Sequence, residues 1–218
     1  YELISLTSAF LAMAAVTLFS FFLAVALDAQ VVVILGLLGG FLTPVLLPSG
    51  ADNAALLFLY VALLDIGIAA VALRKRWLYL VLLAAIGTAH TQVHWAKDFF
   101  TVATGGRAFW IFLGFEALFL AIYFFDRRMA ADKWLAASAA LAGFVALAFG
   151  FWICALPLLA RQSLFFFSFI FLADAGLLAL PVIGRAHRGI ALGAGAMTFA
   201  LVAVWIGFFA PKTPMSAS

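Results

Sequence analysis

Three carboxylic acids stand near the middle of apolar runs that are each long enough to cross a bilayer: Asp65, Glu116 and Asp174. An ionised carboxylate at that depth is costly unless it is protonated, paired or hydrated. Midplane acids bind or relay protons and cations in carriers and pumps. They also serve as structural groups, when a protonated carboxyl joins two helices through a hydrogen bond. No Lys or Arg is expected at the same depth, so the residue types leave both interpretations open.

A second polar feature lies in the apolar run 31–47, where Gly36 and Gly40 are four residues apart. This spacing puts two small residues on one helix face and allows a neighbouring helix to approach closely. Pro44 has no N–H to donate to the Gly40 carbonyl, so we expect a kink and a freed carbonyl that Thr43, water or a carboxyl must satisfy. With the three acids, Gly40, Thr43 and Pro44 form a hypothetical substrate or ion path; the alternative is an ordinary proline kink.

Two histidines, His90 and His94, are four residues apart and therefore share a helix face, with Asp98 one turn further on. This spacing can hold a metal ion. The zinc-protease signature requires Glu directly after the first His, whereas this chain has Thr91. The alternative is a pair of histidines at the membrane surface, beside Trp95.

Composition identifies the environment of these groups. Of 218 residues, 68% are hydrophobic and only 10% are charged, and the mean hydropathy is +1.25. These values are typical of a protein whose solvent is mostly lipid. The lipid bilayer is thus the expected partner, with other membrane or envelope proteins as further candidates, and nucleic acid is excluded. The single cysteine, Cys154, rules out a disulfide within the chain. No nucleotide-binding loop or nucleophile motif is present, so we expect no catalytic residue and no cofactor.

The apolar runs predict an all-α integral membrane fold with about eight transmembrane helices. The predicted spans are 6–27, 31–47, 55–73, 77–95, 108–125, 134–156, 164–183 and 190–210. All six tryptophans fall within a few residues of a predicted span end, where amphipathic rings settle at the membrane surface. This agreement supports the predicted spans independently of hydropathy.

Basic residues predict the orientation of the spans, because cytoplasmic loops carry an excess of Lys and Arg. Loops 3–4, 5–6 and 7–8 carry Arg74, Lys75, Arg76, Arg127, Arg128, Lys133, Arg185 and Arg188. The opposite side carries Lys97, Arg107, Arg161 and Lys212. We therefore expect the first set of loops in the cytoplasm, most simply at a bacterial cytoplasmic membrane, with both ends of the chain outside.

The two halves of the chain show an internal similarity when the sequence is shifted by 109 residues. The shift aligns Pro48 with Pro157, Phe58 with Phe167, Asp65 with Asp174, Gly67 with Gly176 and Arg76 with Arg185. It predicts two tandem four-helix halves related by a twofold axis along the membrane normal, as in parallel-repeat transporters; chance similarity between apolar sequences is the alternative. The expected divisions are 1–104, 105–210 and a disordered tail, 211–218.

Three segments carry a resemblance to a known family. Residues 36–44 read Gly-Leu-Leu-Gly-Gly-Phe-Leu-Thr-Pro, residues 57–67 read Leu-Phe-Leu-Tyr-Val-Ala-Leu-Leu-Asp-Ile-Gly, and residues 72–77 read Ala-Leu-Arg-Lys-Arg-Trp. They resemble the bacterial "predicted membrane protein" family of unknown function, whose members are very long multi-pass proteins. The resemblance implies that this chain is a segment of a longer protein, and it implies no mechanism.

The sequence thus favours transport or permeation of a small solute or ion along the midplane carboxylates. This function predicts that the three acids converge on one water-accessible cavity beside Gly40 and Pro44. A non-catalytic envelope scaffold or assembly subunit is the alternative, in which the same groups serve helix packing. A membrane-embedded metal-dependent enzyme, with His90 and His94 as ligands, comes third.

Overall fold

The computed structural model describes residues 8, 12, 15–16, 19, 30–46, 52–125, 132–184 and 186–209, with the backbone alone for 43–46. This part of the chain is helical and contains no strand. The helices are α2 (Gln30–Leu46), α3 (Ala54–Lys75), α4 (Tyr79–Phe99), α5 (Gly105–Phe125), α6 (Lys133–Cys154), the short α7 (Pro157–Ala160), α8 (Ser163–Val182) and α9 (Gly189–Phe209). The predicted helices from 31–47 onward agree with these bounds within a few residues, and the predicted span 6–27 lies outside the described residues apart from isolated positions.

Five of the described helices are long and apolar enough to cross a membrane: α3, α5, α6, α8 and α9. The structure therefore supports a multi-pass membrane protein, but not the full predicted number of eight spans. In α4 the length is sufficient, yet polar groups such as Gln92, Lys97 and Asp98 lower its hydropathy. In α2 the apolar part, Gln30–Leu42, is shorter than a full span.

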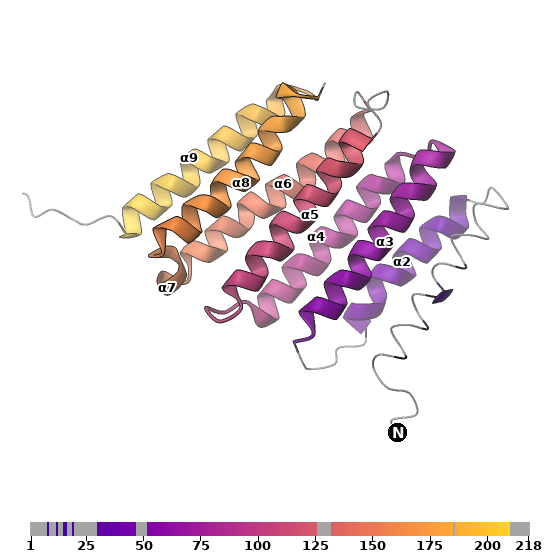
Figure 1. Ribbon diagram of the computed structural model, residues 1–218, viewed down its shortest axis with the longest axis horizontal. Helices are drawn as coiled ribbons and strands as arrows, with labels where there is room; N and C mark the ends of the chain where they lie inside the picture. The colour runs from indigo at the N-terminus through magenta and orange to yellow at the C-terminus, as the bar shows by residue number, and fades with distance from the viewer. Residues whose placement is uncertain are drawn as a thin grey trace, which may run out of the picture.

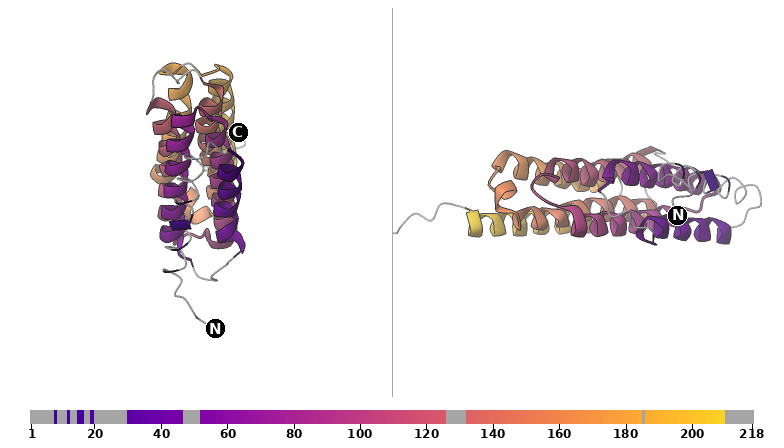
Figure 2. Two further views of the ribbon diagram at one scale, coloured as in Figure 1. Left: turned by 90° about the vertical axis from the view of Figure 1, so that its right-hand side faces the viewer. Right: turned by 90° about the horizontal axis from the view of Figure 1, so that it is seen from below.

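The described helices form an elongated slab of two layers (Figures 1 and 2). One layer contains α2, α4, α6 and α9, and the other contains α3, α5 and α8. Each helix packs against its neighbours in its own layer and against helices that follow or precede it in the other layer. One buried apolar cluster extends through the whole slab, from Val33 to Leu201. The core is thus continuous across residue 104, where the sequence places a division.

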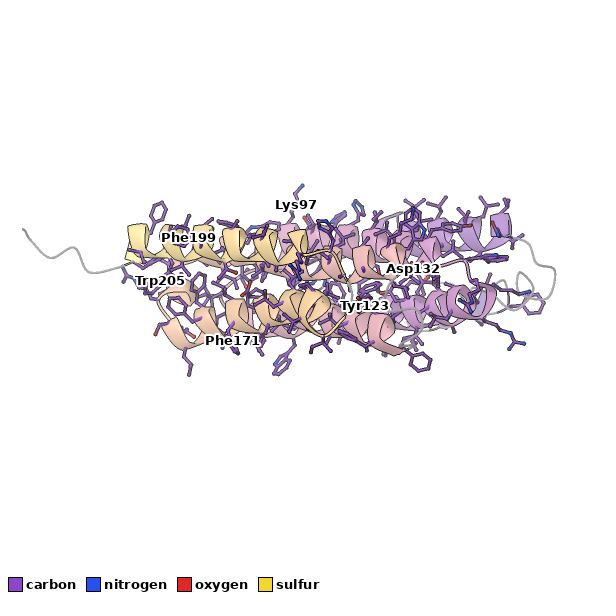
Figure 3. The ribbon with its side chains drawn as sticks, turned by 90° about the horizontal axis from the view of Figure 1, so that it is seen from above. Lys97, Tyr123, Asp132, Phe171, Phe199 and Trp205 are labelled. Atoms are coloured by element: carbon purple, nitrogen blue, oxygen red, sulfur yellow. The ribbon has the colours of Figure 1, made fainter. Side chains whose placement is uncertain are left out.

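The centre of the slab is α6, which packs against α4, α5, α8 and α9 and is the most buried span. Small residues recur along its buried faces, among them Ser138, Ala142, Gly143, Ala146 and Gly150. Small side chains let neighbouring helix backbones approach closely, which is how helices associate in lipid. The most exposed span is α9, at one edge of the slab. Phe171 and Phe199 point away from the slab on its two faces, as expected for lipid-facing side chains (Figure 3).

Two groups of three helices have the same arrangement. In the first unit, α2, α3 and α4 all contact one another; in the second unit, α6, α8 and α9 do the same. When the numbering is shifted by 109 residues, the bounds of α3 coincide with those of α8, and the bounds of α4 with those of α9, within a few residues. Corresponding helices lie in the same layer, so a displacement along the slab relates the units. The expected twofold axis along the membrane normal does not fit this arrangement, because such an axis would exchange the layers.

Candidate functional site

Asp65 lies close to the middle of α3, as predicted, and faces α4. Its side chain is only 1% exposed. The Thr88 hydroxyl of α4 donates a hydrogen bond to Asp65 Oδ2 at 2.7 Å, while Oδ1 has no partner among the described residues. Hydrogen bonds between polar side chains of neighbouring helices are one way in which helices associate in lipid. The observed contact therefore joins two helices.

The carbonyl of Gly40 finds a partner that the sequence interpretation missed. Tyr60 of α3 donates its hydroxyl hydrogen bond to this carbonyl at 3.2 Å. The α2 helix continues through Pro44 to Leu46, so the proline does not break it. Gly40 is also the point of close approach, because a Cβ there would lie 3.1 Å from Leu64 Cδ1. No described atom lies within 4 Å of a Cβ built at Gly36, so among the described residues only Gly40 of the expected two-glycine face makes a close approach.

Glu116 lies in the middle of α5 and enters a notch formed by glycines of two other helices. A Cβ on Gly176 of α8 would overlap Glu116 Oε1, and a Cβ on Gly143 of α6 would lie 3.0 Å from it. The side chain is only 3% exposed, and Oε1 has no hydrogen-bond partner among the described residues. The two glycines thus provide the space for a carboxyl group inside the three-helix contact.

Asp174 lies two residues before Gly176 on α8, the glycine that the Glu116 carboxyl contacts. The Thr198 hydroxyl of α9 donates a hydrogen bond to Asp174 Oδ1 at 2.9 Å. Asp174 is half-buried, unlike Asp65. The structure therefore brings two of the three predicted acids together.

Asp65 faces α4, whereas Glu116 faces α6 and α8, and α5 stands between α3 and α8 in their layer (Figure 1). Gly40 belongs with Asp65, since it contacts Tyr60 and Leu64 of α3. The side chains of Thr43 and Pro44 lie outside the described part of the structure. The residues of the predicted path are thus divided between two regions.

The histidine pair lies on an exposed part of α4. The two imidazole rings of His90 and His94 are edge to face with their centroids 6.3 Å apart. His94 Nδ1 lies 3.1 Å from Asp98 Oδ2, and both side chains are about half exposed. Among the described residues, no group of three or more His, Cys, Asp or Glu side chains is arranged to hold a metal ion.

A further polar cluster, which the sequence interpretation did not include, links three elements at one end of the slab. Asp52 Oδ1 accepts a hydrogen bond from Trp95 Nε1 at 3.0 Å and another from the Ala54 N–H at 3.3 Å. Asp52 Oδ2 forms an ion pair with Arg107. The cluster fastens the start of α3 to the end of α4 and the start of α5. A Trp and an opposite-charge pair at predicted span ends were the signals for it.

The sequence indicated only weakly the hydroxyl residues that hydrogen-bond to the candidate site residues. Hydroxyl residues in apolar spans usually hydrogen-bond to a backbone carbonyl or to a polar group of a neighbouring helix. Thr88, Thr198 and Tyr60 are such residues. Their presence indicated polar contacts between helices, but the chain alone did not indicate which partner each would reach.

Comparison with known proteins places the whole chain in one family. A family model described as "Predicted membrane protein (DUF2339)" matches residues 1–217. That description gives a membrane class and no activity. Neither curated proteins nor solved structures provide a match to this chain.

Proposed function

We propose that this chain, which belongs to the DUF2339 family of predicted membrane proteins, is a non-catalytic scaffold or assembly element of the membrane. The observation that carries the proposal is the division of the buried acids between two dry helix contacts. Asp65 and Glu116 are 1% and 3% exposed, and they face different neighbouring helices. A transport path through the slab would require them to share a hydrated cavity.

The polar contacts inside the slab support the same function, because most of them join one helix to the next. Such contacts are Thr88 with Asp65, Tyr60 with the Gly40 carbonyl, Gln92 with the Ile111 carbonyl, and Thr198 with Asp174. Hydrogen bonds between helices and close packing hold helices together in lipid, where no hydrophobic effect does so. The groups that first suggested chemistry therefore serve association of the spans.

The test is a flux measurement on the purified protein in liposomes that contain a pH-sensitive dye. We expect no proton or cation flux above that of protein-free liposomes under an imposed gradient. In a growth assay that depends on the protein, Asp65→Asn and Asp174→Asn should retain function while the variants unfold more easily. Specific flux that is lost in either variant would contradict the scaffold proposal.

A second candidate function is proton or cation permeation at Glu116 and Asp174. It is favoured by one observation: Glu116 Oε1 is buried without a hydrogen-bond partner among the described residues, and it contacts Gly176, two residues after the half-buried Asp174. Carboxyl groups in this setting exchange protons or coordinate cations in carriers. Under this function, the liposome flux is present and Glu116→Gln abolishes it, whereas Asp65→Asn leaves it unchanged.

The proposal also includes an orientation of the chain in the membrane and an internal duplication. The basic residues of the loops after α3, after α5 and after α8 favour a cytoplasmic position for these loops, and a bacterial cytoplasmic membrane is the expected location. The equivalent contacts of the first and second units support an internal duplication, and among the described residues it covers three helices of each half. The division into 1–104 and 105–210 remains a proposal, as does a metal-dependent activity at His90 and His94, for which the described residues provide no third ligand.

A further inference from the structure

We propose that a groove at the first turns of α5 and α8 binds an anionic glycerophospholipid, with its phosphate at Arg161. The groove has a volume of about 660 Å³, within the range of small-molecule sites. Its lining comprises Gly106, Phe109, Trp110, Arg161, Gln162, Ser163, Leu164, Phe165 and Ser168. Polar and charged groups come from the connection before α8, and aromatic groups come from both helices.

The charge that recognises the phosphate is Arg161. Its side chain is exposed, and it makes no ion pair with any described residue. Arg107, at the same end of the slab, is instead neutralised by Asp52. A guanidinium group binds phosphate oxygens through two parallel hydrogen bonds, so an unpaired arginine beside a groove favours a phosphate ligand. Gln162 and Ser163 supply further donors next to it.

The groove is formed before any ligand binds, because the short helix α7 that precedes Arg161 is fixed on two sides. Trp205 of α9 donates its indole N–H to the Ala160 carbonyl at 2.7 Å. Leu159 packs directly against Gly105, at the start of α5, where a Cβ would lie 2.8 Å from Leu159 Cδ1. A preformed site loses little conformational entropy on binding, which favours affinity.

The floor of the groove is aromatic and equally well fixed. The Phe109 ring contacts the rings of Phe165 and Phe169, with centroids 5.4 and 5.5 Å apart. Trp110 and Leu164 are 74% and 84% exposed at the sides. The groove thus combines apolar side chains of α5 and α8 with a polar end at Arg161, Gln162 and Ser163, so a ligand with an acyl chain fits better than a soluble phosphate.

The position of the groove along the helices matches the depth of a lipid headgroup. Gly105 and Ser163 are the first residues of α5 and α8, and the lower ends of both helices lie together with α7 in Figure 1. Trp110 and Trp205 lie at the same end of the slab, where tryptophans settle at the membrane surface. A phosphate at Arg161 would therefore lie level with the headgroups of that leaflet.

The test is a lipid titration of the purified protein in detergent, followed by native mass spectrometry. We expect one phosphatidylglycerol to bind at least about tenfold more tightly than phosphatidylcholine or inorganic phosphate, since a charge-assisted contact is lost with the neutral headgroup. Arg161→Gln should weaken phosphatidylglycerol binding by about tenfold for the same reason. Equal binding of the two lipids, or preferential binding of inorganic phosphate, would overturn the proposal.

Two further variants separate the groove from the general charge of the surface. Lys97→Gln removes a cation at the same end of the slab but outside the groove, and it should leave binding unchanged. Gly106→Leu places a side chain where a Cβ meets open space, so it should fill the groove without disturbing the fold and should abolish binding. If Gly106→Leu binds like the unaltered protein, or if Lys97→Gln weakens binding as much as Arg161→Gln, the lipid is bound elsewhere.

Discussion

Asp65 in the first unit and Asp174 in the second unit each accept a hydrogen bond from a threonine of the following helix, yet only Asp65 is fully buried. The two units also differ in their neighbouring helices. In the first unit α5 packs against α3 and α4, whereas no described helix lies beside α8 and α9 in the same way. The same local contact is thus dry in one unit and partly open in the other, which shows that the surrounding helices set the environment of each acid.

The units also differ at the contact between their first two helices. Tyr60 donates to the Gly40 carbonyl in the first unit, whereas the corresponding residues in the second unit, Phe169 and Phe149, form an edge-to-face ring pair with centroids 5.9 Å apart. The physical reason for this difference is the residue one turn further along the first helix of each unit. Pro44 leaves the Gly40 carbonyl without its helical donor, whereas Ile153 at the corresponding position has an N–H. A hydroxyl is needed in one unit and not in the other.

A third difference explains why a third acid enters only the second unit. Gly143 makes room for the Glu116 carboxyl on α6, whereas the corresponding residue of α2 is Ile34. Its side chain is too large for such a notch. The glycines, rather than the acids, therefore distinguish the region that holds two carboxyl groups from the region that holds one.

The largest expected effect on stability comes from filling the notch that Gly143 and Gly176 form around Glu116. Gly176→Leu should destabilise the protein by about 3 kcal/mol, because the new side chain competes with Glu116 for space between well-packed helices. The free energy of unfolding is measured in mixed micelles of a mild detergent and sodium dodecyl sulfate. Gly114→Leu is the matched control, since a Cβ there meets no described atom within 4 Å. Equal losses for the two variants would show that the notch is not tightly packed.

A smaller effect is expected where a glycine faces a ring in the first unit. A Cβ on Gly87 would lie 2.6 Å from Phe41 Cγ, whereas a Cβ on Gly150 in the second unit would lie 3.1 Å from Leu201 Cδ1. We expect Gly87→Ala to cost about 2 kcal/mol and Gly150→Ala about 1 kcal/mol, because the leucine adjusts more easily than the ring. The same unfolding measurement compares them, and the opposite order would contradict the predicted difference between the units.

The hydroxyl contact of the first unit is expected to contribute about 1 kcal/mol, which Tyr60→Phe should remove. In a Pro44→Ala background the Gly40 carbonyl regains a helical donor, so the same substitution should cost less. A double-mutant cycle on the free energy of unfolding measures this coupling. Tyr79→Phe, which removes an exposed contact with Gln30, serves as the control. Additive effects of Tyr60→Phe and Pro44→Ala would show that the two residues are not linked.

The smallest effect on stability is expected for the two threonines that donate hydrogen bonds to Asp65 and Asp174. Thr88→Val and Thr198→Val each keep the side-chain shape and remove one hydrogen bond, worth about 0.6 kcal/mol on average between membrane helices. Thr88 is buried and Thr198 is only half-buried, so Thr88→Val should be the more destabilising. Thermal unfolding of the purified variants in one detergent provides the measurement. A larger loss for Thr198→Val would contradict the expected effect of burial on the two contacts.

The helices themselves followed from the sequence to a large extent. Lipid leaves no water to satisfy backbone groups, so each apolar run of sufficient length must form a helix that satisfies its own hydrogen bonds. This constraint predicted the bounds from 31–47 to 190–210 within a few residues and placed Asp65, Glu116 and Asp174 near the middle of their helices. The prediction was less secure for α2 and α4, where a short apolar part and several polar residues weaken the signal.

The contacts of the candidate site were predicted only in part. The expected need of the Gly40 carbonyl for a partner was correct, but the partner is Tyr60, which was not among those proposed. The convergence of Glu116 with Asp174 and the separation of Asp65 depend on which helix lies beside α5. Gly143 gives no signal in sequence, since glycine is common throughout the chain, and the internal similarity marks Gly176 without indicating that a carboxyl of another helix lies beside it.

The sequence by itself determined the membrane class, the family, the described helices and the position of each acid along its helix, because all four depend on apolar length and on local residue order. The tertiary structure alone decided the two-layer order of the helices and, through it, which polar groups meet. The physical reason is that spans in lipid are apolar on all sides, so the sequence does not mark which face a helix turns toward its neighbours. Whether a carboxyl lies in a glycine notch or beside a threonine is settled only when the helices pack.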